Sequence, residues 1–236
     1  MSHSMPSLSN TPITVRHIEF KFPDQFPKYF AFNNPAATAL FVVFSAAFPP
    51  GERFFVDSLR NLRDHTNDEQ LKQQIRGFIG QEAMHGREHE RFNHSLVKLG
   101  FDVATPIRMV KFSLKILKKL SRKHQLGCTV AMEHLTAKLA VQWLTYDKLK
   151  ELSDQNLMHI WQWHALEELE HKNVSFDLYQ QLGKYRFIDR LISLSAVSTL
   201  ILPAAFFSWL VIAYKDGCFK NLPTTWEGLT LMSGFI

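Results

Sequence analysis

Glutamates stand on four helical faces that are otherwise apolar, and this pattern constrains the fold more than any other feature of the chain. Side chains three and four residues apart share one face of an α-helix. Burying one unpaired carboxylate costs several kcal/mol, and neighbouring carboxylates raise one another's pKa values. Bound cations would remove both costs, so the pattern predicts helices that converge on metal ions. The four residues are Glu52, Glu82, Glu133 and Glu168.

Histidines accompany two of these glutamates at helical spacing. The chain contains Glu82-x-x-His85 and His164-x-x-x-Glu168-x-x-His171, so imidazoles share the faces of the carboxylates. Carboxylate and imidazole donors together suit iron and manganese, and they also accept zinc. We therefore expect two iron ions, with an iron–manganese pair, manganese alone or zinc as alternatives. No catalytic residue is predicted beyond the ligands, which are Glu52, Glu82, His85, Glu133, His164, Glu168 and His171.

The remaining periodicity indicates an all-α fold. No stretch alternates apolar and polar residues as a strand does, and seven helical segments are predicted. Residues 52 and 82 are each about fifteen residues from a corner near residue 66 or 67, so antiparallel helices would place them level. A Glu from each of two helices and a Glu-x-x-His from each of two others is the ligand pattern of ferritin-like dinuclear bundles. The predicted helices are 36–48, 51–64, 69–98, 106–123, 128–152, 155–182 and 191–214.

We therefore expect a ferritin-like antiparallel four-helix bundle with extra helices and an apolar C-terminal segment. Residues 1–34 would form an arm, 35–182 the metal-binding bundle and 183–236 an apolar helical segment. The run Pro49-Pro50-Gly51 is expected to end the first helix. His89 is expected to support a ligand or to be an interior histidine with its hydrogen bonds satisfied, rather than to bind metal. His164 is open to either role, since its spacing of four from Glu168 suits a supporting hydrogen bond as well as a shared metal. Four glutamates fall off the inward stripes and are expected to be solvated: Glu88, Glu90, Glu167 and Glu170.

Charge is unevenly distributed along the 236 residues, whose formal net charge is +5. No Asp or Glu occurs between residues 103 and 132, where seven Lys and Arg residues gather between Arg108 and Lys123. No nucleic-acid-binding module accompanies them, so they form either a solvated face or a surface for peripheral contact with an anionic membrane, which is the partner we expect. Residues 191–214 are long and apolar enough to span a bilayer or lie in one, although Pro203 favours a helix packed on the bundle or in a homodimer. Without a signal-peptide or disulfide pattern, a cytoplasmic location at the inner face of the membrane is expected.

Two resemblances bear on function. The run Phe48-Pro49-Pro50-Gly51-Glu52-Arg53-Phe54-Phe55, followed by Gln81-Glu82-Ala83-Met84-His85 and His89, resembles a bacterial family described as predicted metal-dependent hydrolases, over most of the chain. The ligand spacing over 52–171 is similar to that of ferritin-like di-iron oxidases and oxygenases. Within that group, the motif from His164 to His171 resembles the p-aminobenzoate N-oxygenase type. The first resemblance implies hydrolysis, and the second implies oxygen chemistry.

From the ligand set we expect a di-iron oxidase or oxygenase that activates O2 on a small or lipidic substrate, with an electron donor. Two alternatives remain open. A zinc-dependent hydrolase would use His85-x-x-Glu88-His89, with Glu88 as general base. A non-enzymatic iron-binding protein would hold the same metals without turnover.

Overall fold

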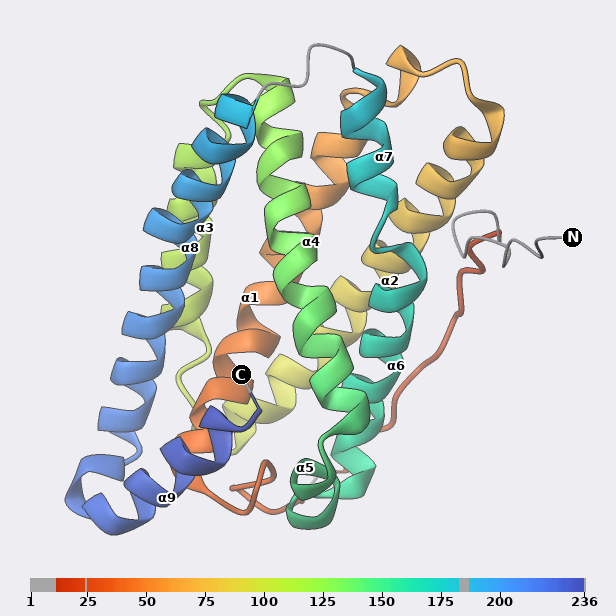
Figure 1. Cartoon of the computed structure of the whole chain (residues 1–236). Helices are drawn as coiled ribbons and strands as arrows, with labels where there is room; N and C mark the ends of the chain where they lie inside the picture. Colours follow the sequence, from red (N-terminus) through yellow and green to blue (C-terminus); the bar gives the residue numbers. More distant parts are fainter. Residues whose placement is uncertain (1–11, 24, 183–186, 236) are drawn as a thin grey trace, which may run out of the picture.

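The computed structural model describes residues 12–23, 25–182 and 187–235, and within these ranges it contains helices and no β-strand. This confirms the all-α prediction. The centre of the molecule is a bundle of four helices (Figure 1), namely α1 (Pro35–Arg60), α2 (Glu69–Lys98), α4 (Arg122–Thr145) and α6 (Gln155–His171).

The order of the helices gives the bundle its topology. A corner with the short helix η2 (Arg63–His65) reverses the chain between α1 and α2, and α5 (Asp147–Leu152) lies at the corner between α4 and α6. Helix α3 (Ala104–Leu117) runs back along the molecule, so α2 and α4 point in the same direction (Figure 1). This is the long crossover connection that the ferritin-like pattern predicts.

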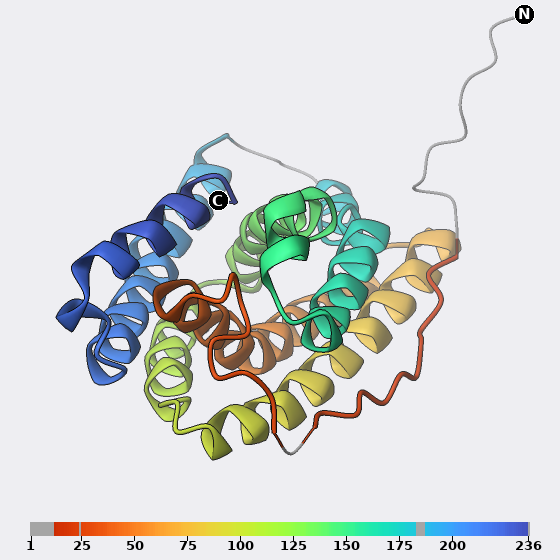
Figure 2. The same ribbon diagram turned by 90° about the horizontal axis from the view of Figure 1, so that it is seen from below.

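The described part of the C-terminal quarter of the chain adds three helices and a short 3₁₀ turn to this bundle. Helix α7 (Val174–Gln181) follows α6, and α8 (Phe187–Lys215) packs beside α3 and α4. After η3 (Cys218–Lys220), α9 (Leu222–Ser233) packs against α1. Figure 2 shows α8 and α9 on one flank of the molecule, far from α2 and α6. The apolar C-terminal helix is thus present as predicted.

Side-chain caps explain where the bundle helices begin. A short polar side chain just before the first helical residue accepts a hydrogen bond from a backbone N–H that has no partner within the helix. Asn34 accepts from the backbone of residues 36 and 37 at α1, and Asp68 accepts from residues 70 and 71 at α2. Ser121 and Asp154 cap α4 and α6 in the same way. The predicted start of α2 at residue 69 is therefore confirmed.

Helix α1 corrects the prediction that Pro49-Pro50-Gly51 ends a helix, because it continues through both prolines. Proline has no N–H, so the carbonyls of Ser45 and Ala46 lose their donors within the helix. The side-chain amide of Asn93 in α2 donates to the Ser45 carbonyl at 3.0 Å and replaces one of these bonds. Buried residues on both sides of the prolines anchor the two halves of this continuous helix, so packing outweighs the local cost.

Three further boundaries differ from the prediction. Helix α3 ends at Leu117 and α4 begins at Arg122, because Ser121 caps α4 before Gly127 is reached. Gly127 lies inside α4, where a Cβ would stand 2.4 Å from Ser193 Oγ of α8, so it permits close packing instead of ending a helix. The segment predicted as 128–152 is divided after Thr145. The segment predicted as 155–182 is divided after His171, and no sequence signal marks that break.

The described part of the N-terminal arm crosses α2 and α6 (Figure 2). Two glycines of α2 make room for it. A Cβ at Gly77 would stand 2.6 Å from Ile13 Cβ, and one at Gly80 would stand 2.4 Å from Val15 Cγ2. The backbone carbonyl of Thr14 accepts a hydrogen bond from the Gln81 side chain at 3.1 Å. The arm therefore covers the side of the bundle on which α2 and α6 meet.

Candidate metal centre

The four bundle helices bring all seven predicted ligands into the interior. Helix α1 contributes Glu52, α4 contributes Glu133, and the remaining ligands come from α2 and α6. Each of the seven residues is at most 2% exposed. The burial predicted from the apolar stripes is therefore what the structure shows; the role of these residues as ligands stays a prediction.

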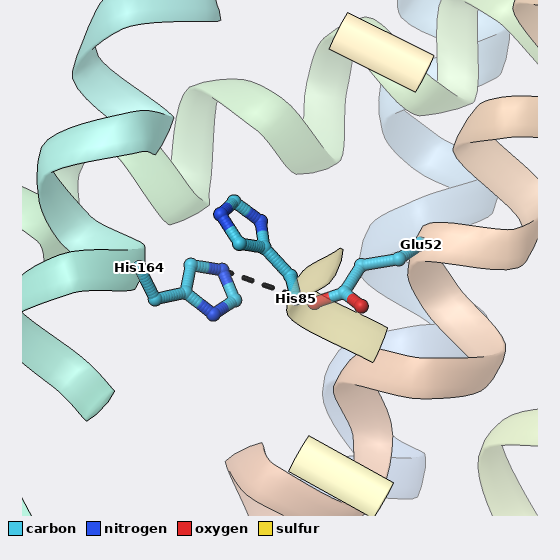
Figure 3. A group of neighbouring side chains, drawn as sticks. All are labelled: Glu52, His85 and His164. Carbon is cyan, nitrogen blue, oxygen red and sulfur yellow. Dashed lines mark ion pairs between the residues drawn. The ribbon is translucent and has the colours of Figure 1, made fainter. Parts of the chain in front are cut away.

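The seven residues form two adjoining groups whose donor atoms lie within 4.8 Å of one another in each group. Figure 3 shows the first group, in which the side chains of Glu52, His85 and His164 converge from α1, α2 and α6. His164 Nε2 lies 3.8 Å from Glu52 Oε1. The second group consists of Glu82, Glu133, Glu168 and His171.

Glu168 lies between the two groups. Its Oε1 oxygen is 3.0 Å from His164 Nε2 and 3.9 Å from His85 Nδ1 in the first group. The same oxygen is 3.7 Å from His171 Nε2 in the second group. One carboxylate oxygen is thus within reach of both positions, which is the geometry that a ligand bridging two ions requires.

Most donor atoms in the centre lack a protein partner. Both carboxylate oxygens of Glu52, Glu82 and Glu133 are buried without a hydrogen-bond donor among the described residues. The same is true of His85 Nδ1 and of His171 Nε2, which approaches Glu82 Oε1 to 3.0 Å outside hydrogen-bond geometry. Buried polar atoms nearly always have hydrogen-bond partners, and leaving one unsatisfied destabilises the fold. Cations between these atoms would satisfy them together, so the residues present fit two metal ions.

Electrostatics in the metal-free centre lead to the same inference. Burial, together with the charges of Glu82 and Glu168, raises the pKa of Glu52 well above its ordinary value. Burial and the Glu168 charge do the same to the pKa of Glu133. The pKa of Glu82 rises to about 7, again mainly through burial. Without cations the site would therefore hold protons at pH values where glutamate is ordinarily ionised.

The outward nitrogen of His85 and that of His171 each meet a hydrogen-bond acceptor. His85 Nε2 lies 3.1 Å from Glu167 Oε2, and His171 Nδ1 lies 2.9 Å from Gln81 Oε1. In a neutral ring the proton sits on the nitrogen that donates, so the other nitrogen presents its lone pair to the centre. Such outer partners fix the tautomer and orientation of metal-binding histidines.

A longer chain of hydrogen bonds fixes the tautomer of His164. The Ser45 hydroxyl donates its one proton to Asn93 Oδ1 at 2.8 Å, so it accepts from His89 Nδ1 at 3.0 Å. Burial lowers the pKa of His89, which keeps the ring neutral and leaves Nε2 as an acceptor. His164 Nδ1, 3.0 Å away, then carries the proton of its own ring. In a neutral ring the lone pair of His164 Nε2 would then face Glu168 Oε1 at 3.0 Å, so that a proton or a metal ion would be needed between these two atoms.

Two glutamates predicted to be solvated are instead buried. Glu167 has an ion pair at 3.0 Å with Arg16 of the arm in addition to its contact with His85. Glu88 accepts from Arg87 at 2.9 Å, from Arg91 at 2.7 Å and from the backbone N–H of Phe20 at 3.1 Å. The prediction was wrong because the arm covers both positions, while Arg16 of the arm pairs with Glu167 and two arginines of α2 pair with Glu88. Glu90 and Glu170 are exposed, as expected.

The zinc site considered as an alternative, His85-x-x-Glu88-His89, is not assembled. Glu88 is held by two arginines and the arm, so it is not available as a general base. Both ring nitrogens of His89 are occupied by Ser45 and His164. His89 is thus hydrogen-bonded to His164, and its role as a supporting residue stays a prediction. The partners missed from sequence are Ser45, Gln81, Asn93 and Glu167, which have no motif of their own.

Comparison with known proteins places the chain in a family. No curated protein and no solved structure matches it. The family model described as "Predicted metal-dependent hydrolase" matches residues 14–235, which include the arm, the bundle and the C-terminal helices. The chain therefore belongs to the predicted metal-dependent hydrolase family.

Proposed function

We propose that the protein is a hydrolase with a dinuclear metal centre, held by the seven buried carboxylate and imidazole residues. The observation that carries the proposal is the pair of adjoining donor groups with Glu168 between them. The family description supports hydrolysis as the reaction. All seven residues would hold the metal ions, in place of the zinc motif His85-x-x-Glu88-His89.

A route for substrate and water supports this reading. A hollow of about 340 Å³ reaches from the surface to Glu52 and Glu82, and Arg53 and Arg60 also line it. Gly86 keeps this approach narrow but open, since a Cβ there would stand 3.0 Å from Glu52 Oε2. A hydrolase needs such access, because water is a reactant.

The residues of the chain then have separate tasks. Bound divalent ions would supply Lewis acidity and lower the pKa of a coordinated water. Glu52, which lies where the hollow meets the centre, would accept the proton that water loses and return it to the leaving group. Glu167, Gln81 and His89 hold the three imidazoles in orientation.

Aromatic rings close the other sides of the centre. Phe48 lies 4.5 Å from the ring of His164 and Phe78 lies 4.6 Å from that of His171, measured between centroids. Trp163 stands edge-on to His85 at 4.8 Å. Water is thereby excluded except along the hollow, which keeps the local dielectric low and the electrostatic interactions strong.

A second candidate is the di-iron oxidase or oxygenase expected from the ligand pattern. It is favoured by the carboxylate-rich donor set on a crossover bundle and by the aromatic walls, which would protect reactive species from water. This reaction would need O2 and an electron donor as partners.

One experiment separates these functions. The protein is expressed with iron, manganese and zinc supplied in turn, and bound metal is measured by mass spectrometry. Each preparation is assayed for hydrolysis of chromogenic carboxylic and phosphate esters, and for O2 uptake with a reductant. We expect two ions per chain and hydrolysis that Glu52→Gln abolishes, whereas Glu151→Gln, on exposed α5, has no effect.

The other outcomes are equally informative. Reductant-dependent O2 uptake without hydrolysis would establish the second candidate. Two ions without either activity would support a non-enzymatic iron-binding protein. Fewer than two ions in every preparation would overturn the dinuclear centre itself.

A further inference from the structure

Two hollows on the surface join at the entrance to the metal centre. The one that reaches Glu52 and Glu82 shares Pro49, Arg53 and Glu90 with a second hollow of about 550 Å³. The second lies between α1, α2 and α3, and its volume is typical of a small-molecule site. Together they form one groove with the metal centre at one end.

Two arginines of α1 line this groove, Arg53 where the two hollows join and Arg60 in the hollow of the metal centre alone. Arg53 and Arg60 are exposed, and neither has a hydrogen bond or ion pair with any residue that the structure describes. Glu90 lines both hollows but forms no ion pair with either arginine in the described structure. Two divalent ions would balance the four buried carboxylates, so the arginines would remain free to bind an anion. A guanidinium group matches the geometry of a carboxylate or phosphate.

The far end of the groove is apolar. Val97 of α2 is 55% exposed there, and Val103, Ala104 and Ile107 from the start of α3 complete the wall. Asn93, His94 and Lys111 stand at its polar edge. A hydrocarbon chain placed along this wall would remove apolar surface from water, which is favourable.

We propose that the substrate is an amphiphilic anion, in which a carboxylate or phosphate group is attached to an apolar chain. Arg53 and Arg60 bind the anionic group, and the wall around Val97 takes the chain. The bond to be broken then lies toward Glu52 and Glu82. This inference rests on the proposed function, since it names the substrate class of the same centre.

Binding is measured calorimetrically on the metal-loaded protein with four probes: decanoate, decyl phosphate, inorganic phosphate and decanol. We expect both amphiphilic anions to bind more tightly than phosphate or decanol. Arg53→Gln should weaken their binding at least about tenfold, and Arg53→Lys should restore part of it because the charge returns without the paired donors. Glu90→Gln should strengthen it. Arg63→Gln, in η2 outside both hollows, is the matched control.

A second variant tests the chain-binding end. Val97→Trp fills the apolar hollow, so it should weaken the binding of decyl phosphate and leave the binding of inorganic phosphate unchanged. Metal content of each variant is measured alongside. Equal binding of decanol and decanoate, or no change with Arg53→Gln and Val97→Trp, would overturn the substrate class. If the protein retains its metal and hydrolyses esters but binds neither amphiphilic anion, only this inference is overturned. If the wild-type protein binds no metal, the proposed function itself is overturned.

A different observation concerns the outer face of α8. By length and composition α1 and α8 could each cross a membrane, but only 33% of the apolar window of α8 is buried, against 56% for α1. Its inward residues pack on α3 and α4, and Ser113 of α3 donates to the Leu200 carbonyl at 3.0 Å. The outward residues remain more than 40% exposed: Leu191, Ile192, Leu194, Leu202, Phe206 and Phe207.

Helix α3, beside this face, supplies a row of exposed cations. No acidic residue occurs in the sequence from residue 104 to 132, and Lys118 has its partner in Asp57 of α1, at 2.9 Å. The exposed cations of α3 and of the two residues that follow it are Arg108, Lys111, Lys115, Lys118 and Lys119. An exposed apolar surface flanked by cations complements a membrane that carries anionic lipids. We also infer that α8 and α3 place the protein on such a membrane, with α8 lying along it.

Flotation with phosphatidylcholine vesicles, with and without phosphatidylserine, tests this surface. We expect binding only with phosphatidylserine, and loss of binding in high salt, in Phe206→Ser/Phe207→Ser and in Lys115→Gln/Lys119→Gln. The matched control is Lys148→Gln/Lys172→Gln, distant from α8. Absence of wild-type binding to the vesicles would overturn the inference. A homodimer in sedimentation that dissociates in the double serine variant would also overturn it, because a second copy of the chain would then cover this face.

Discussion

The centre of the bundle and the outer face of α8 reverse the usual distribution of side chains. Four carboxylates and three imidazoles lie in the interior at no more than 2% exposure, while Phe206 and Phe207 are 55% and 53% exposed. A buried polar cluster and an exposed apolar patch are the informative departures from the ordinary rule. Each is unfavourable in the isolated chain, so each indicates something that the chain binds: cations inside and an apolar surface outside.

The largest effect should come from removing the carboxylate that lies between the two donor groups. Glu168→Ala deletes an oxygen within 3.9 Å of three imidazole nitrogens, so we expect loss of both ions. Metal affinity should fall more than about 100-fold, beyond the effect of losing an outer partner. Metal content after dialysis measures it, with Glu151→Ala as the exposed control. Retention of both ions would remove the reason to treat the interior cluster as a metal site.

Breaking the hydrogen-bond chain behind His164 should have the next largest effect. His89→Phe keeps an aromatic ring but removes the acceptor for His164 Nδ1, and Ser45→Ala removes the partner of His89. Loss of such partners typically weakens metal binding about 10- to 100-fold. Competition titration measures this, and His159→Phe on the exposed side of α6 should change nothing. Unchanged affinity in both variants would mean that His164 is not a ligand.

Lowering the pH should weaken metal binding by about tenfold per unit for each proton displaced. Burial raises the pKa of Glu82 to about 7, so below that pH the metal-free protein holds a proton that an ion must displace. The same raised pKa stabilises the metal-free fold most below the unfolded value of 4.5, and this contribution is lost as the pH rises through about 7. Titrations between pH 6 and 8 test this; an affinity independent of pH would contradict it.

The smallest effect is expected on the outer face of α8. Leu202 is 48% exposed, so Leu202→Ala should change the free energy of unfolding by no more than about 0.5 kcal/mol. The matched change Leu96→Ala, at a fully buried position of α2, should cost about 2–5 kcal/mol. Chemical denaturation measures both. A large cost at Leu202 would show that α8 is covered in solution.

Helical periodicity was enough to predict the bundle and the convergence of the seven donor residues, because offsets of three and four residues determine a face without knowledge of any neighbour. It could not predict the burial of Glu88 and Glu167. The arm that covers them comes from far away in the sequence: Arg16 pairs with Glu167 across 151 residues, and the Phe20 N–H donates to Glu88 across 68. Ser45 and Asn93 could not be predicted either, because no sequence pattern indicates that they contact a histidine of the site.

Pro49 links the backbone of α1 to the chemistry of the centre. Because its nitrogen carries no hydrogen, the Ser45 carbonyl is left to the amide of Asn93, and that bond determines which way the amide faces. The amide oxygen then orders Ser45, and through His89 the orientation reaches His164. A proline in the middle of a helix thus determines, through this chain of hydrogen bonds, which ring nitrogen of His164 carries a proton. Replacing Pro49 with alanine would restore a helical hydrogen bond and at the same time compete with Asn93 for the carbonyl that sets the tautomer.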